Sequence, residues 1–194
     1  MQHCEFVSAF SGMIPADAAI PAGFLQALKM VRVPKGRLLL ADGEICDKLW
    51  FVQVGLVRGF HLRENEDGNF GEVTEWFAAE REFFHSAASF LMQVPASESI
   101  EALEDCTLNY IRREDLYQLY RQYPEICCLG RTIAERSWLM HKELLRDMRS
   151  LSAAQKLEAF RIRSGELLTR VPQKYIASYL GISENYVSKL KARY

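Results

Sequence analysis

Four polar side chains near the end of the chain carry groups that can hydrogen-bond to the edges of nucleic-acid bases: Glu184, Asn185, Ser188 and Lys189. A glutamate accepts a hydrogen bond from cytosine, an asparagine pairs with adenine, and a lysine suits guanine or a backbone phosphate. Ser183 stands directly before them and is a good N-cap. A helix that begins there carries all four residues on the exposed face of its N-terminal part.

The residues around this helix predict its support, a helix-turn-helix over residues 171–193. Ala177 is small where two helices touch, and Gly181 follows the first helix where the chain must turn with positive φ. Val187 and Leu190, three residues apart, form the buried stripe of the second helix. This spacing is typical of two short helices that cross around a tight turn, and the second helix of such a pair usually enters the major groove of DNA.

The charge distribution favours a nucleic-acid role over the alternative, a helical hairpin without one. Residues 152–194 hold eight Lys or Arg and three Glu, which is a net charge of +5. The whole chain carries −1, so residues 1–151 carry −6. A basic end joined to an acidic body is the electrostatic pattern expected of a DNA-binding module attached to another domain.

The composition indicates a globular protein with one full domain and one small one. The chain has 194 residues, of which 49% are hydrophobic and 11% aromatic. It contains no apolar run of about 18 residues, so no membrane span is expected. The first ten residues lack the pattern of a signal peptide. We therefore expect a cytoplasmic protein without a membrane partner.

The five cysteines do not form a metal-ligand pattern. Their spacing is irregular, no C-x-x-C pair occurs, and the four histidines are scattered. Zinc and iron–sulfur sites need convergent ligands, so we expect no metal or other cofactor and interpret the cysteines as buried, reduced thiols. No nucleophile–base pair or phosphate loop indicates an enzyme. The cysteines are Cys4, Cys46, Cys106, Cys127 and Cys128.

Short apolar runs separated by glycine turns predict an antiparallel β-sandwich. After a helical lead-in over residues 1–30, short apolar and alternating runs recur between Val31 and Ile111 at intervals of 8–12 residues. We therefore predict an α+β fold whose residues 1–123 form a jelly roll, also called a double-stranded β-helix.

A short helix over residues 114–123 and a long helix over about 125–149 follow the predicted sandwich. The apolar residues of the long helix recur at steps of three, four, seven, four and four, close to a heptad seam. This stripe either packs on the chain's own sandwich or pairs with a second copy. We favour a dimer helix over residues 124–150, because a two-fold dimer presents two DNA-binding domains, called heads below, to a palindromic site. The stripe comprises Ile126, Leu129, Ile133, Met140, Leu144 and Met148.

Residues 151–194 are predicted to form the DNA-binding domain. Residues 149–151 are the expected hinge, and Ser152 to Gln155 have the pattern of a capping box that begins the next helix. That helix is expected to end near Arg163, because Gly165 follows. Residues 166–171 leave room only for a short strand pair.

This order of sandwich, long helix, hinge and helix-turn-helix resembles the Crp/Fnr superfamily of bacterial transcription regulators over nearly the whole chain. The local motifs are VPKG at 33–36, GLVR at 55–58, IEALED at 100–105 and VPQKYIASYLGIS at 171–183. The last motif is specific, and the others are moderately so. The chain is most similar to compact members of the Bacteroidetes type, which end soon after the recognition helix.

The resemblance implies a cyclic-nucleotide pocket in the sandwich, but the phosphate anchor is missing here. In the superfamily, a Gly-Glu pair at a helix start and an Arg-Ser/Thr-Ala triplet hold the ribose and the cyclic phosphate. A missing arginine and an added carboxylate weaken phosphate binding, so we expect weak or no binding of cyclic AMP. In this chain, the place of the Gly-Glu pair is taken by Glu82, Phe83, Phe84, His85 and Ser86, and the place of the Arg-Ser/Thr-Ala triplet is taken by Ala96, Ser97 and Glu98.

The aromatic residues around this position leave two interpretations open. They either fill a core or line a pocket for an apolar or otherwise different effector. His85 is likewise either a ligand or switch residue or a structural histidine.

For the helix-turn-helix, the resemblance implies that four residues of the second helix read base edges in double-stranded DNA: Glu184, Asn185, Ser188 and Lys189. It implies contacts with the DNA backbone for Gln173, Lys174, Ser183, Lys191 and Arg193. We predict a homodimeric regulator with DNA, RNA polymerase and an unidentified small-molecule effector as partners. The alternative is a small-molecule sensor module whose DNA binding is weak or lost.

Overall fold

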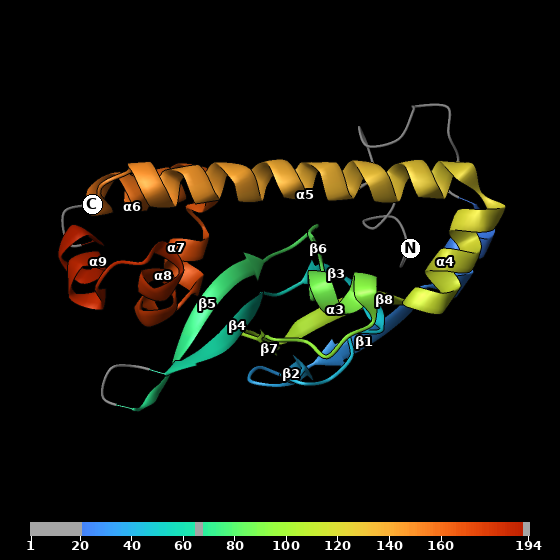
Figure 1. Cartoon of the computed structure of the whole chain (residues 1–194), viewed down its shortest axis with the longest axis horizontal. Helices are drawn as coiled ribbons and strands as arrows, with labels where there is room; N and C mark the ends of the chain where they lie inside the picture. The colour runs from blue at the N-terminus through green and yellow to red at the C-terminus, as the bar shows by residue number, and fades with distance from the viewer. Residues whose placement is uncertain (1–20, 65–67, 192–194) are drawn as a thin grey trace. The chain divides into compact units, whose positions relative to one another are not determined.

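The computed structural model describes residues 21–64 and 68–191 (Figure 1). The chain divides into two compact units, one of Met1–Gly59 and Phe77–Ser137 and the other of Phe60–Trp76 and Trp138–Tyr194. This division differs from the predicted boundaries at residues 123 and 150, because a β-hairpin and the long helix each contribute to both units. The units are described separately below.

The strands form two four-stranded sheets, in the orders β1-β8-β3-β6 and β2-β7-β4-β5. Neighbouring strands of the first sheet are antiparallel. In their register, Met30 lies opposite Asn109, and Trp50 lies opposite both Tyr110 and Phe84. The expected α+β fold with an N-terminal β-sandwich is confirmed. The strands are β1 Lys29–Val33, β2 Leu38–Leu40, β3 Lys48–Val54, β4 Val57–Glu64, β5 Phe70–Ala78, β6 Phe83–Phe84, β7 Ser99–Ala102 and β8 Cys106–Arg112.

Apolar side chains from both sheets form the core of the first unit. Val52, Leu56, Ile100 and Leu108 have no exposed surface, as expected for inward-facing residues of a sandwich. The turn between β3 and β4 requires glycine at position 55, where φ is +108°. A Cβ there would lie 2.9 Å from the Cα of Cys106, so the two backbones can approach this closely only without a side chain.

Helices α2 Ala22–Ala27, α3 Ala87–Met92 and α4 Arg113–Gln122 belong to the first unit, together with the first half of α5 Pro124–Ser150. The predicted helical lead-in extended to residue 30, and its last part is wrong. Lys29 and Met30 belong to β1, because pairing with β8 satisfies their backbone. The lead-in residues 1–20 lie outside the described residues.

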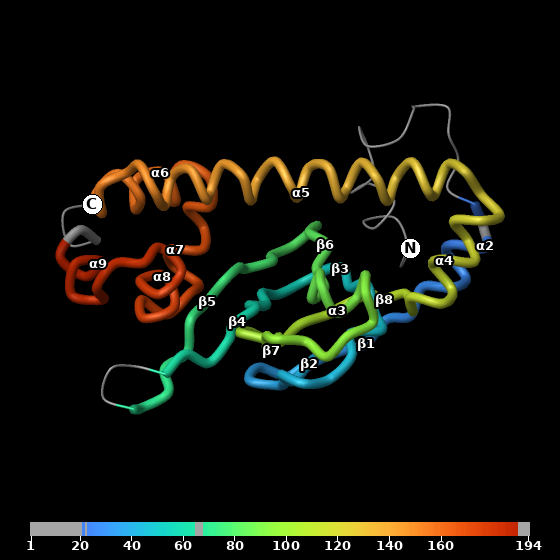
Figure 2. The backbone as a smooth tube through the Cα atoms, viewed as in Figure 1, coloured from blue at the N-terminus to red at the C-terminus, as the bar shows by residue number. Residues whose placement is uncertain are grey.

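The described residues of the second unit comprise the outer part of the β4–β5 hairpin, the remaining half of α5, and helices α6 Ala153–Ser164, α7 Leu167–Arg170, α8 Gln173–Leu180 and α9 Glu184–Lys191 (Figure 2). The short strand pair expected at residues 166–171 is wrong. Leu167 is buried, and the amide of Val171 donates to its carbonyl at 2.9 Å. A helical turn therefore satisfies this segment locally.

A capping box and an ion pair stabilise the bend between α5 and α6. The expected capping box is confirmed, because the Ser152 hydroxyl accepts from the Gln155 amide and the Gln155 side chain accepts from the Ser152 amide. Arg163 of α6 reaches back to Asp147 of α5 at 2.9 Å. The hinge predicted at residues 149–151 thus lies inside the second unit. In the described residues, no helix has the length and hydropathy that a membrane span requires.

Candidate DNA-binding head and effector pocket

The turn between α8 and α9 has the geometry that the sequence predicts. Gly181 adopts φ 62° and ψ 41°, and its amide donates to the carbonyl of Ser178. The amide of Ile182 donates to the carbonyl of Ala177 at 3.0 Å, so the last carbonyls of α8 have partners. Ile176 and Ala177 are buried where α8 packs against α9.

Helix α9 is capped and anchored so that its first turn faces solvent. The Ser183 hydroxyl accepts from the amide of Tyr186 at 3.3 Å, which confirms its N-cap role. Val187 is fully buried and fixes the rotation of the helix. The side chain of Leu190, the second residue of the predicted stripe, lies outside the described residues.

The four predicted base-reading residues are all exposed on α9: Glu184, Asn185, Ser188 and Lys189. Of the predicted backbone contacts, Lys174 and Ser183 are exposed and Gln173 is half-buried. The Lys174 ammonium lies 4.6 Å from the centroid of the Tyr175 ring, which keeps the charge near the start of α8. The side chains of Lys191 and Arg193 lie outside the described residues.

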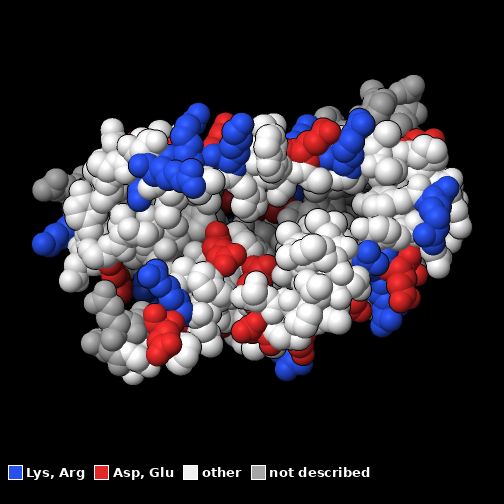
Figure 3. All heavy atoms as spheres, in the orientation of Figure 1, with Lys and Arg blue, Asp and Glu red and all other residues white. Residues whose placement is uncertain are grey.

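Cations also gather elsewhere in the second unit. Figure 3 shows Lys and Arg side chains over the second half of α5 and over α6 on the visible face. Some of these charges are neutralised locally, because Arg161 pairs with Glu158 and Arg163 pairs with Asp147. Lys142, Arg146 and Arg149 add exposed charge along α5.

The positions expected to hold a cyclic nucleotide form part of the folded interior. Phe84, Ser86 and Ala96 are buried, whereas Glu82 and Ser97 are exposed. Both backbone groups of Ala96 are bonded, its amide to the carbonyl of Glu44 and its carbonyl to the amide of Gly43, each at 2.8 Å. The residue at the arginine position therefore serves to close a loop.

An acid and an aromatic pair occupy the rest of this region. The side chain of Glu98 is buried, and its charge is one of the influences that raise the pKa of the Cys46 thiol, after burial as the main cause. Phe83 is half-buried, with its ring centroid 4.9 Å from that of Phe51. An anionic ligand would meet a carboxylate here, which is unfavourable.

The sequence prediction missed an ion pair between a buried arginine and a half-buried glutamate, which are 1% and 21% exposed. Arg58 of β4 has 1% of its surface exposed, and its guanidinium donates twice to one carboxylate oxygen of Glu101 on β7, at 3.0 and 2.8 Å. GLVR and IEALED carried the resemblance, but their arginine and glutamate are 43 residues apart, and only strand pairing places them together. This internal cation already has a carboxylate as its counter-ion.

His85 has the environment of a structural histidine. Its ring meets the edge of Phe90 with centroids 4.8 Å apart. Burial lowers the pKa of His85 to about 4, so the imidazole stays neutral near neutral pH. A switch between pH 5 and 8 would need a pKa in that range, so the switch interpretation of His85 is not supported.

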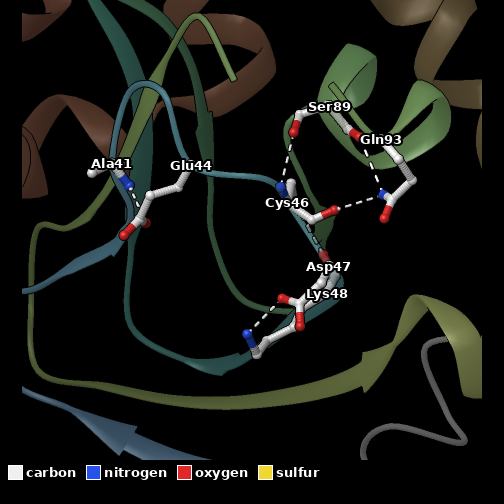
Figure 4. Close-up of polar contacts among 7 residues, drawn as sticks. All are labelled: Ala41, Glu44, Cys46, Asp47, Lys48, Ser89 and Gln93. Atoms are coloured by element: carbon white, nitrogen blue, oxygen red, sulfur yellow. Dashed lines mark hydrogen bonds and ion pairs between the residues drawn. The ribbon is translucent and has the colours of Figure 1, made fainter. Parts of the chain in front are cut away.

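A cavity of about 390 Å³ opens at the β2–β3 end of the sandwich. It adjoins the predicted pocket positions, because its lining residue Glu44 accepts from the Ala96 amide and the charge of Glu98 acts on its lining residue Cys46. It is closed on one side by polar contacts to α3, where the Cys46 amide donates to the Ser89 hydroxyl and Gln93 donates to the Cys46 carbonyl (Figure 4). Lys48 pairs with Asp47 at its rim. The lining residues are Leu39, Leu40, Glu44, Ile45, Cys46, Asp47, Lys48 and Trp50.

The cysteines fall into two groups. Cys46 and Cys106 are buried, and burial raises the pKa of both thiols, which keeps them protonated as predicted. Cys127 and Cys128 on α5 are exposed, so the prediction of burial is wrong for these two. Cys4 lies outside the described residues. Across residues 21–64 and 68–191, no three His, Cys, Asp or Glu side chains are grouped as metal ligands.

Helix α5 has two apolar faces, of which the sequence prediction identified one. Ile126 and Leu129 of the predicted seam are buried within their own chain and are not free to contact a second copy. Ile133, Leu144 and Met148 are half-buried, and Met140 is exposed. A second stripe follows steps of seven, four and seven and is exposed throughout: Cys127, Ala134, Trp138 and Leu145.

Comparison with known proteins identifies the sandwich and the overall fold. Residues 30–123 match the family model of the cyclic nucleotide-binding domain. The chain matches none of the curated protein sequences. Among solved structures, FixK2 from Bradyrhizobium japonicum is 15% identical, with a TM-score of 0.70 over 86% of this chain and 83% of that one.

Two further solved structures have the same arrangement. A mutant of CooA from Carboxydothermus hydrogenoformans is 16% identical, with a TM-score of 0.69 over 91% of this chain and 80% of that one. A putative regulator of the Crp/Fnr family from Eubacterium rectale is 16% identical, with a TM-score of 0.68 over 92% and 85%. The sandwich over residues 30–123 is therefore similar to the cyclic nucleotide-binding domain, and the chain has the fold of solved Crp/Fnr-type regulators.

Proposed function

We propose that this protein is a DNA-binding transcription regulator that acts as a homodimer and does not respond to cyclic AMP. The observation that carries the proposal is the capped, exposed first turn of α9, held by Val187 behind an αL glycine. Glu184, Asn185 and Lys189 present there the acceptor and donor groups that major-groove recognition uses.

Lys189 provides the direct test of base reading. We expect selection from random duplexes to enrich a palindromic sequence, and Lys189→Ala to weaken binding to that sequence by about tenfold while reducing selectivity. Lys174→Ala should weaken binding to all sequences alike and lower the salt slope by about 1. Fluorescence anisotropy over a salt series measures both effects.

Lys35→Ala is the matched control, because it removes an exposed lysine from a turn of the sandwich rather than from α8 or α9. It should leave affinity and salt slope unchanged. Selection without an enriched sequence, together with Lys189→Ala and Lys174→Ala binding like wild type, would refute DNA recognition by this head.

A dimer is supported by the exposed stripe on α5. Trp138 and Leu145 are 62% and 51% exposed and lie seven residues apart on one face of α5, and apolar side chains grouped on one face mark interaction surfaces. The stripe continues through Ala134 to Cys127 with the spacing of a helix–helix seam. Two copies joined along it would present two heads to a palindromic site.

The sensor domain is proposed to have lost its response to cyclic AMP. Ala96 replaces a cationic anchor, Glu98 adds a buried acid, and Arg58 is already neutralised by Glu101. A cyclic phosphate would have to displace Glu101 from Arg58, and that exchange removes a doubly hydrogen-bonded partner.

Thermal unfolding gives the corresponding measurement. Cyclic AMP at about 100 times a micromolar dissociation constant would add roughly 2.7 kcal/mol to the free energy of unfolding if it bound the folded state. We expect no more change with cyclic AMP than with adenosine, which lacks the phosphate. A stabilisation by several degrees with cyclic AMP alone would show that an anchor other than the residues above binds the phosphate.

A further inference from the structure

The outer part of the β4–β5 hairpin is bonded to the first helix of the helix-turn-helix. Both belong to the second unit. The amide of Thr74 on β5 donates to the hydroxyl of Ser178 on α8 at 2.9 Å, and that hydroxyl donates to the carbonyl of Glu72 at 3.3 Å. The Ser178 hydroxyl thus provides the acceptor and the donor that the backbone of a neighbouring strand would otherwise provide.

The position of β5 explains why this contact forms. In the order β2-β7-β4-β5, strand β5 is at the edge of its sheet, so one row of its backbone groups has no neighbouring strand. Ser178 satisfies two of these groups, and Thr74 is 3% exposed beneath it. A serine hydroxyl can donate and accept through one atom, as these two hydrogen bonds require.

The bonded face of α8 is the face that the proposed DNA complex needs. Ser178 follows Lys174 by four residues, so the two side chains are neighbours on one side of the helix. Lys174 is a proposed contact with the DNA backbone. The hairpin therefore lies within one helical turn of the expected path of the phosphates.

The charge of the hairpin is also unsuited to DNA. Its described residues 60–64 and 68–76 contain three glutamates, Glu64, Glu72 and Glu75, and one arginine, Arg63. All three glutamates are exposed, and the carbonyl of Glu72 is the one that Ser178 binds. Carboxylates beside a phosphate path repel it, so the docked hairpin opposes the duplex.

We infer that the β4–β5 hairpin is an autoinhibitory element, held on the DNA-binding head by Ser178 and released when DNA binds. This inference rests on the proposed DNA-binding function. DNA and the hairpin then compete for one face of α8, and the Ser178 contact sets how strongly the hairpin competes.

Ser178→Ala tests the competition, because it removes the hydroxyl and keeps the helix. We expect Ser178→Ala to bind a fluorescent mixed-sequence duplex about tenfold more tightly than wild type at low salt. Hydrogen exchange at the Thr74 amide should be faster in free Ser178→Ala than in the wild type. In the wild type, adding duplex should accelerate exchange at the same amide.

Two variants control this result. Ser164→Ala makes the same change on α6 of the same unit, where Ala also raises helix propensity, and should bind like wild type. Ser178→Thr keeps a hydroxyl and should retain the wild-type affinity and Thr74 protection. Equal duplex affinity of Ser178→Ala and wild type, or unchanged Thr74 exchange, would overturn the inference. Failure of every variant to bind duplex would instead overturn the proposed function and the inference with it.

Discussion

Arg58→Ala is expected to lower the free energy of unfolding by about 3–5 kcal/mol. The guanidinium is 1% exposed, and its removal leaves the Glu101 carboxylate in the sandwich without two of its donors. A lost partner costs more here than on the surface, because water cannot replace it fully. Urea denaturation followed by tryptophan fluorescence measures the loss.

The double variant Arg58→Met, Glu101→Gln distinguishes charge from packing. It replaces the pair with groups that need no counter-ion, so it should recover a large part of the stability that Arg58→Ala loses. A loss below about 1 kcal/mol in Arg58→Ala would place the pair among surface ion pairs in strength. That result would contradict the interpretation of Arg58 as an internally satisfied cation.

Trp138→Asp is expected to raise the dissociation constant of the proposed dimer by about 100-fold. A buried tryptophan supplies a large share of a helix–helix interface, and an aspartate in its place brings two carboxylates together across the two-fold axis. Sedimentation equilibrium over a concentration series measures the dissociation constant.

Met140→Asp is the matched control for this prediction. Met140 is 60% exposed, close to the 62% of Trp138, but it lies two residues further along α5 and so on a different face. It should leave the dimer intact. Dissociation by Met140→Asp and not by Trp138→Asp would instead support the seam that the sequence pattern indicated.

The parts of the fold that the sequence predicted are those in which local residues determine local structure. Gly181 needs a positive φ whatever surrounds it, and Ser183 caps a helix through its own hydroxyl. The capping box at Ser152 belongs to the same class. These positions located the helix-turn-helix and the exposed residues of α9 correctly.

The features that were missed depend on residues distant in sequence. Arg58 was recognised only as part of a motif, because Glu101, its counter-ion, comes from another strand. The two apolar faces of α5 have nearly the same period, and the sequence does not say which one the chain itself covers. The Ser178 contact was also invisible, because it joins residues more than 100 positions apart.

The contacts that stabilise the bend between α5 and α6 determine where the DNA-binding head can be joined to another protein in a chimera. A chimera cut at residue 151 would separate Asp147 from Arg163, and it would lose Met148, whose methyl group would lie 3.3 Å from a Cβ at Gly181. A cut at the 137–138 boundary keeps both contacts inside the transplanted segment. The second half of α5 is thus part of the transferable head, and a recipient sensor must supply the rest of the helix.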